Sequence, residues 1–301
     1  MWLTNSSVGR KVVMSITGLC LILFVTFHAV MNGVAIFWPA GYNMVCAFLG
    51  ANWYALIASM GLAALFIIHI IYALWLTVQN RKARGNDRYA VVRKPEQVEW
   101  SSQNMLVLGI VVLAFLCVHM IQFWAKMQLA EIIECNYVYE GVPVPPQAGT
   151  WFIQIAFSQI WTPIVYIIGF VALWFHMTHG FWSMFQSAGW NNDTWLPRLK
   201  CIGNWWCTIV VGLFLVEAIV FTVQANNDAY LTNPALIEQY EEFAMEQAHC
   251  NGPVAESAEV VIVNCEENCA PCNNNCESNC NPCSSDCNEC QSECQATNVN
   301  E

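Results

Sequence analysis

Histidine recurs inside apolar stretches of this chain, where an ionisable side chain is costly and therefore marks a candidate functional site. Four separate apolar runs each carry such a residue: His28, His69, His119 and His176. The last lies in the segment Phe175–Ser183, which reads FHMTHGFWS. An imidazole in this setting either bonds to a neighbouring helix or binds a metal, and for one histidine alone both explanations serve equally well.

The four histidines fall at two depths. His28 and His119 lie about halfway or further from the basic ends of their runs, whereas His69 and His176 lie nine or ten residues short of those ends. At about 1.5 Å of rise per residue, the two pairs differ in depth by roughly 10 Å. Each haem iron takes one axial ligand above and one below its ring, so the pattern favours a membrane cytochrome b with two bis-histidine haems.

Five apolar runs are long enough to cross a hydrocarbon core, which needs about 20 residues. In lipid these runs must be helical, because only intrahelical hydrogen bonds satisfy the backbone there. The first continues past Phe37 without a small-residue cleavage site, so we expect a retained span. The five expected spans are roughly Val12 to Phe37, Trp53 to Val78, Met105 to Met127, Trp161 to Gln186, and Gly203 to Val223.

Composition separates a membrane part from a tail. The 301-residue chain is 56% hydrophobic and only 11% charged, too apolar for an ordinary soluble domain. Fourteen of its 22 acidic residues lie from Asp228 onward, beyond Lys200, the last basic residue. We therefore predict an all-α fold, with a five-helix membrane cytochrome b domain over 1–227 and an acidic, Cys-rich extramembrane tail over 228–301. The tail's charge argues against nucleic acid as a partner.

Basic residues predict the orientation. Arg10 and Lys11 precede the first span, six basic residues fill the loop after the second, and Arg198 and Lys200 fill the loop after the fourth. By the positive-inside rule the N-terminus and these two loops are cytoplasmic, which leaves the C-terminal tail outside.

Two further side chains are candidates for the haem or quinone environment. His179 lies one turn from His176 on nearly the same helical face, so it is an alternative ligand or a partner for a haem propionate or a neighbouring helix. Glu217 is the only carboxylate inside an expected span. It is either a proton acceptor near a quinol site or a protonated acid bonded to another helix.

The tail is rich in cysteine and repeats with a period of eleven residues. Three interpretations remain open: disulfides, soft-metal binding, and a largely disordered low-complexity extension. The candidate metal ligands are Cys265, Cys269, Cys272, Cys276, Cys280, Cys283, Cys287, Cys290 and Cys294.

The region from about Ser6 to Gln224 resembles the five-helix, two-haem cytochrome b subunit of succinate:quinone oxidoreductases, which include fumarate reductases and succinate dehydrogenases. Thr17-Gly18 with Phe27-His28 resembles that family's first helix, and His69 with Tyr72 resembles its second. His119 matches the third-helix ligand, and Phe175-His176 with Gly180 and Trp182-Ser183 resembles the fourth-helix signature. Trp174 stands where some members have a proton-conducting glutamate, so that route is not implied.

The resemblance implies two haem b groups, a distal one held by His28 and His119 and a proximal one held by His69 and His176. It also implies menaquinone as the diffusible substrate, and an iron–sulfur subunit and a flavoprotein subunit on the cytoplasmic side of a bacterial inner membrane. The chain would then carry electrons and would not itself react with dicarboxylates. The alternatives are the dihaem cytochrome b subunit of a nitrate reductase-type complex and a haem-free metal transporter.

Overall fold

The computed structural model describes residues 6–84, 99–133 and 135–250. Within these ranges, the prediction of five helices long and apolar enough to cross a membrane is confirmed. The five are α2 (Ser7–Phe37), α4 (Trp53–Arg84), α6 (Met105–His119) with its π-helical continuation η1 (Met120–Trp124), α9 (Trp161–Ser187) and α10 (Trp195–Asn226). Each begins within a few residues of its expected span except α10, which begins eight residues earlier (203 − 195).

Local sequence signals define several helix starts. The hydroxyl of Ser6 accepts a hydrogen bond from the amide of Gly9 at 2.9 Å and so caps α2. The side-chain oxygen of Asn192 accepts from the amide of Trp195 at 2.7 Å, which explains why α10 begins there. Asn233 precedes Pro234 and caps α11 (Pro234–Cys250) in the same way.

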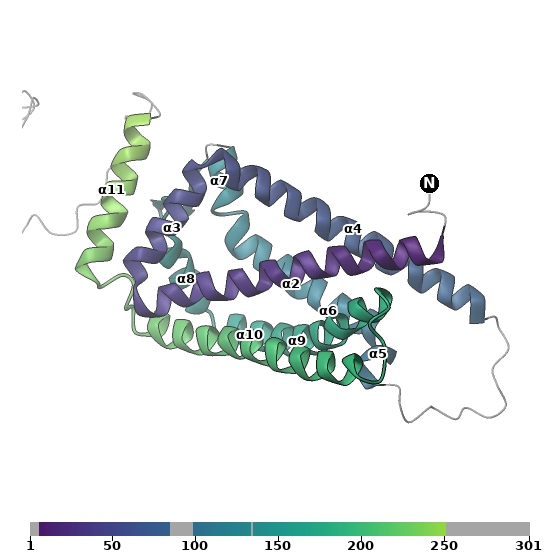
Figure 1. Cartoon of the computed structure of the whole chain (residues 1–301). Helices are drawn as coiled ribbons and strands as arrows, with labels where there is room; N and C mark the ends of the chain where they lie inside the picture. The colour runs from purple at the N-terminus through teal and green to yellow at the C-terminus, as the bar shows by residue number, and fades with distance from the viewer. Residues whose placement is uncertain (1–5, 85–98, 134, 251–301) are drawn as a thin grey trace, which may run out of the picture. The chain divides into compact units, whose positions relative to one another are not determined.

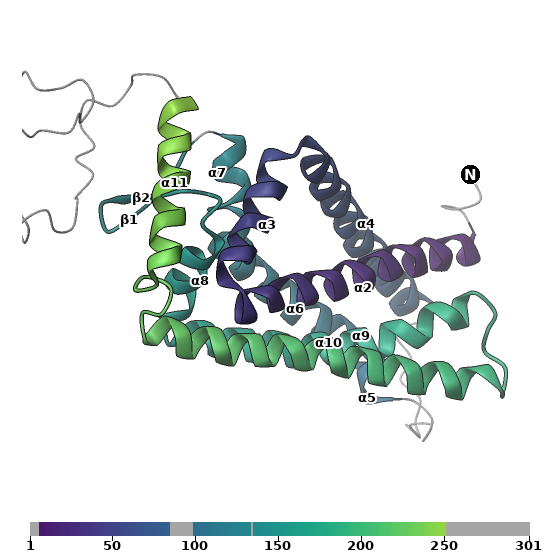
Figure 2. The ribbon, with the colours of Figure 1, turned by 60° about the vertical axis from the view of Figure 1, so that its left-hand side comes forward.

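The long helices pack around α9, which lies against α10, α6 and α2 (Figure 1). α2 lies in turn against α10 and α4. α4 packs mainly on α2 and α3 (Pro39–Ala51), and none of its described side chains is buried. Figure 2 shows α4 diverging from the other long helices toward one end of the bundle. The bundle is therefore closely packed on the side of α9 and α10, whereas α4 is held chiefly by α2 and α3.

The shorter elements gather at the two ends of the bundle. α5 (Trp100–Gln103) lies at the end that holds Lys11, Arg81 and Lys200, hereafter the basic end. At the other end lies a cap, which consists of α3, α7 (Gln128–Ile132), the antiparallel strands β1 (Tyr137–Tyr139) and β2 (Val142–Val144), α8 (Gly149–Phe157) and α11 (Figure 2).

The segment predicted as the tail begins with a further helix, α11. This helix contacts α3, and its side chains Leu236 and Tyr240 are buried. Polar contacts fix the helix: the amide of Asn43 donates to Gln239 at 3.0 Å, and the hydroxyls of Thr150 and Tyr240 lie 2.7 Å apart. The acidic composition of this segment concealed an amphipathic helix with an apolar face.

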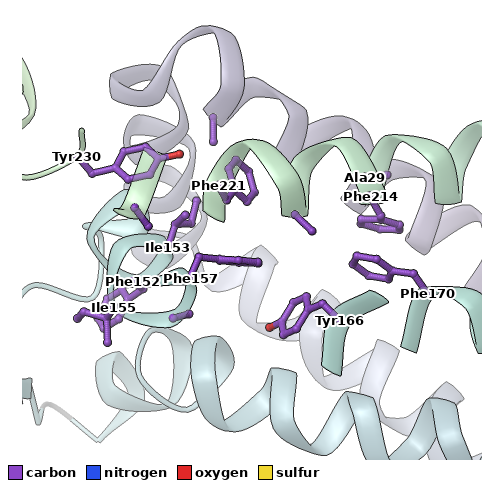
Figure 3. Close-up of a cluster of buried hydrophobic side chains, with 14 of the residues drawn as sticks. Ala29, Phe152, Ile153, Ile155, Phe157, Tyr166, Phe170, Phe214, Phe221 and Tyr230 are labelled. Carbon is purple, nitrogen blue, oxygen red and sulfur yellow. The ribbon is translucent and has the colours of Figure 1, made fainter. Parts of the chain in front are cut away.

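Aromatic side chains fill the core between the long helices and the cap (Figure 3). Phe170 of α9 and Phe214 of α10 stack with ring centroids 5.2 Å apart and planes inclined by 17°. Tyr166, one turn before Phe170, lies edge-on to Phe157 of α8 at 5.2 Å. This packing fixes the rotation of α9 and with it the directions of the polar side chains on that helix.

Candidate functional site

A cavity of about 1750 Å³ runs through the bundle beside α9. Pockets for small ligands are usually roughly 300–1,000 Å³, so this one exceeds the needs of a single small molecule. Its lining comes from α2, α4, α6, α9 and α10 and from the cap. It includes every candidate residue that the sequence analysis placed within the membrane: His28, His69, His119, His176, His179 and Glu217.

The histidines meet in two pairs across this cavity. The rings of His28 on α2 and His119 on α6 have centroids 5.8 Å apart and planes inclined by 81°. The rings of His69 on α4 and His176 on α9 have centroids 6.4 Å apart and planes inclined by 64°. We call these the outer pair, toward the cap, and the inner pair, toward the basic end. They are the pairs that the depths in the sequence predict, while their role as haem ligands stays a prediction.

The spacing of both pairs fits a bis-histidine iron. A metal–imidazole bond is about 2.0 Å, which places two ring centroids on opposite sides of one iron roughly 6 Å apart. Among the described residues, no three His, Cys, Asp or Glu side chains converge as a metal site. Each pair offers only two protein ligands in a large apolar cavity. This suits an iron whose macrocycle supplies four further nitrogens better than it suits a bare metal ion.

In the outer pair, hydrogen bonds set the orientation of the His119 ring. The Nδ1 atom of His119 lies 3.2 Å from the hydroxyl oxygen of Tyr166, and that hydroxyl donates to the Oε1 atom of Gln122 at 2.9 Å. Because the single Tyr166 proton goes to Gln122, its oxygen accepts from His119 Nδ1–H. The lone pair for a metal is then on Nε2.

His69 is oriented in the same way in the inner pair. Its Nδ1 atom lies 3.1 Å from the hydroxyl of Thr17 on α2, and that hydroxyl donates to the carbonyl of Val13 one turn earlier at 3.0 Å. Thr17 therefore accepts from His69 Nδ1–H, which again leaves Nε2 as the free acceptor.

The other member of each pair is held differently. The Nε2 atom of His28 lies 3.2 Å from the side-chain amide nitrogen of Asn32, so a metal on that nitrogen would replace the amide. The buried Nδ1 atom of His176 has no hydrogen-bond partner among the described residues. Its ring lies against Gly109 of α6, where an added Cβ would meet the ring carbon Cε1 at 3.6 Å.

His179 belongs to neither pair. Its Nδ1 atom is 3.9 Å from a carboxylate oxygen of Glu99, and the other oxygen of Glu99 accepts from Lys200 at 2.7 Å. Its ring lies edge-on to Trp182 with centroids 4.8 Å apart. Of the two neighbouring histidines on α9, the structure thus brings His176 to His69 and turns His179 toward charged groups at the basic end.

Glu217 of α10 is only 3% exposed and lies near the outer pair. Its Oε1 atom has no hydrogen-bond partner among the described residues, and it lies 3.6 Å from where a Cβ on Gly33 would stand. Phe214, one turn before Glu217, contacts the His28 ring at 6.1 Å between centroids. A carboxyl group that lines the cavity with one unpartnered oxygen can exchange a proton with a ligand.

Sequence reasoning missed the residues that orient the histidines. Gln122 follows His119 by three positions, and Thr162 and Tyr166 are four apart on α9, so polar residues at helical spacing in apolar spans were the available signal. Nothing in the sequence indicated which of them face His119. The candidate tail ligands, Cys265 to Cys294, lie outside the described residues.

Comparison with known proteins adds no assignment: no family model, curated protein or solved structure matches this chain.

Proposed function

We propose that this chain is the dihaem cytochrome b subunit that anchors a succinate dehydrogenase or fumarate reductase complex in the membrane and passes electrons between menaquinone and an iron–sulfur subunit. The observation that carries the proposal is the meeting of four intramembrane histidines in two pairs, 5.8 and 6.4 Å between ring centroids, within one large cavity. The two pairs lie at different depths along the bundle, so two haems held there would form two successive redox sites.

The protein's own residues supply ligation, orientation and insulation. His28 with His119, and His69 with His176, would hold the two haems, and a bound haem supplies reversible one-electron transfer. Tyr166 and Thr17 fix which imidazole nitrogen is presented to the cavity. Apolar and aromatic side chains around each pair exclude water, which helps to set the redox potential.

Quinol chemistry would take place beside the outer pair. Oxidation of a quinol releases two protons with its two electrons, so it needs a proton acceptor within reach of an electron acceptor. Glu217 is suited to this role because its carboxyl group lines the cavity near His28 and has an unpartnered oxygen. Replacing it with Gln is expected to lower quinol oxidation while both haems remain reducible by dithionite.

The basic end would face the cytoplasm and receive the iron–sulfur subunit, which in turn carries the flavoprotein. Lys11 and Arg81 line the cavity there, and Lys200, near the start of α10, donates to Glu99 just before α5. Cytoplasmic loops carry an excess of Lys and Arg, and a positive surface also orients an acidic partner during association.

The first experiment is a reduced-minus-oxidised visible spectrum with haem quantitation on the purified full-length chain. We expect two low-spin b haems per chain in the wild type and the loss of one in each of His28→Ala and His176→Ala. The matched control is His179→Ala, which removes a histidine from the same helix and should retain both haems.

A wild-type protein without haem contradicts the proposal. Loss of one haem in His179→Ala, with both haems retained in His176→Ala, would show that His179 and not His176 is the fourth ligand. A succinate- or fumarate-linked partner should co-purify from membranes, and co-purification with a molybdenum-dependent nitrate reductase instead would favour the alternative complex.

A further inference from the structure

A buried relay of polar side chains stands behind His119. From its ring nitrogen Nδ1 the contacts lead to the hydroxyl of Tyr166 at 3.2 Å and from there to Gln122 at 2.9 Å. The side-chain amide of Gln122 then donates to the hydroxyl of Thr162 at 3.1 Å. Tyr166, Gln122 and Thr162 are 4%, 8% and 0% exposed, so water does not compete for these bonds.

The π-helical turn η1 brings Gln122 into this relay. α6 ends at His119 and the next residues wind with a wider turn, in which the amide of Ala125 donates to the carbonyl of Met120 at 2.8 Å. A π turn holds more residues than an α turn, so each residue advances by a smaller angle about the helix axis. Gln122 and His119, three positions apart, therefore point in more different directions than they would in an α-helix. Gln122 thereby reaches Tyr166 and Thr162, which share one face of α9.

We propose that Tyr166, Gln122 and Thr162 are positioning residues that hold His119 in a single tautomer, with its Nε2 lone pair directed at the cavity. The inference that this nitrogen binds a haem iron rests on the proposed function. The tautomer itself rests on the direction of two contacts: the Tyr166 hydroxyl donates to Gln122, and its oxygen then accepts from the imidazole.

Within the part of the chain that the structure describes, the inner pair has no comparable relay. Thr17 holds His69 but donates to the backbone of its own helix, and the Nδ1 atom of His176 has no partner among the described residues. Substitutions in the relay should therefore act on the outer haem alone. Thr17→Val should act on the inner haem alone, which makes the two variants reciprocal controls.

The test uses Tyr166→Phe, which removes one hydroxyl and keeps the ring that packs on Phe115, Phe157 and Phe170. In haem-free, ¹⁵N-histidine-labelled full-length protein, nuclear magnetic resonance should show His119 with its proton on Nδ1. The variant should shift His119 to a mixture of tautomers. In haem-loaded protein, we expect the outer haem to be lost about 10–100-fold more readily and its low-spin electron paramagnetic resonance signal to shift.

Three variants complete the design. Gln122→Leu should reproduce the effect by freeing the Tyr166 hydroxyl, Thr162→Ser should preserve wild-type behaviour, and Tyr72→Phe on α4 is the control for removing a tyrosine hydroxyl elsewhere in a span. An unchanged His119 tautomer in Tyr166→Phe, or equal loss of both haems, overturns the proposal. A wild type that binds no haem refutes the proposed function instead, and the tautomer measurement on the haem-free protein still decides the relay.

Discussion

Gly169 of α9 allows close approach of Phe115, which lies on α6 one turn before His119. A Cβ on Gly169 would lie 2.4 Å from the Phe115 ring, which itself stacks on His119 with centroids 6.1 Å apart. Phe115 also lines the cavity. The absence of a side chain at this one position therefore allows α6 and α9 to bring His119 and Tyr166 into contact.

Gly169→Ala is expected to destabilise the bundle by about 1–3 kcal/mol through overpacking and, under the proposed function, to loosen the outer haem before the inner one. Thermal denaturation followed at the haem Soret band measures both effects. The control is Gly180→Ala on the same helix, where an added Cβ meets nothing within 4 Å. Equal melting temperatures for the two variants would show that Phe115 moves aside without cost.

Among residues, the histidine positions could be predicted because each interrupts an apolar run, and their depths follow from counting along helices of known rise. Their hydrogen-bond partners could not, since these depend on how each helix is rotated about its axis. Thr17 and Tyr166 lie 52 and 47 positions from the histidines they contact. That rotation is set by interlocking aromatic contacts such as Phe170 with Phe214, which leave no periodic signal in the sequence.

Among the elements, α11 shows how composition can hide a packed helix. Its acidic residues assigned it to the predicted extramembrane tail from residue 228, and composition alone gave no sign that Leu236, Tyr240 and Phe243 recur at helical spacing and are buried. The five long helices were recognisable from run length alone. The short cap elements were not, because α7 and the two strands span only five and three residues each.

Docking of α11 should weaken at high pH. Burial raises the pKa of Tyr240 to about 12, against an ordinary value near 10 for an unfolded tyrosine. The protonated phenol's contribution to stability is thus intact below pH 10 and is lost as pH rises through about 12. The neighbouring Tyr230 also has a raised pKa because it is buried, so the two act in the same direction.

Tyr240→Phe should cost about 1 kcal/mol at pH 8 by removing the hydrogen bond to Thr150, and should then lose less stability than the wild type between pH 10 and 12. Circular dichroism melting of the solubilised protein across this range provides the comparison. Tyr54→Phe, on an exposed ring, is the control and should follow the wild type. Parallel pH profiles for Tyr240→Phe and the wild type would count against a role for this phenol.

At the scale of the whole molecule, the two ends of the bundle differ in charge and in structure. The basic end carries Lys11, Arg81 and Lys200, whereas the cap presents acidic side chains such as Glu140 and Glu241. We expect the basic end in the cytoplasm. A fluorescent protein fused before Met1 should fluoresce, and alkaline phosphatase fused after Glu301 should be active. The reverse result for both fusions would show that the protein has the opposite orientation in the membrane.

The two histidine pairs are interleaved along the chain, which bears on how the protein is made. α9 contributes His176 to the inner pair and Tyr166 to the relay that orients His119, so neither site is complete until α9 has been translated. His176 follows His119 by 57 residues (176 − 119), which takes roughly 3–11 s at 5–20 residues per second. Under the proposed function, cofactor loading is thus completed only after insertion of the fourth span, and until then His69 lies in the membrane without its partner His176.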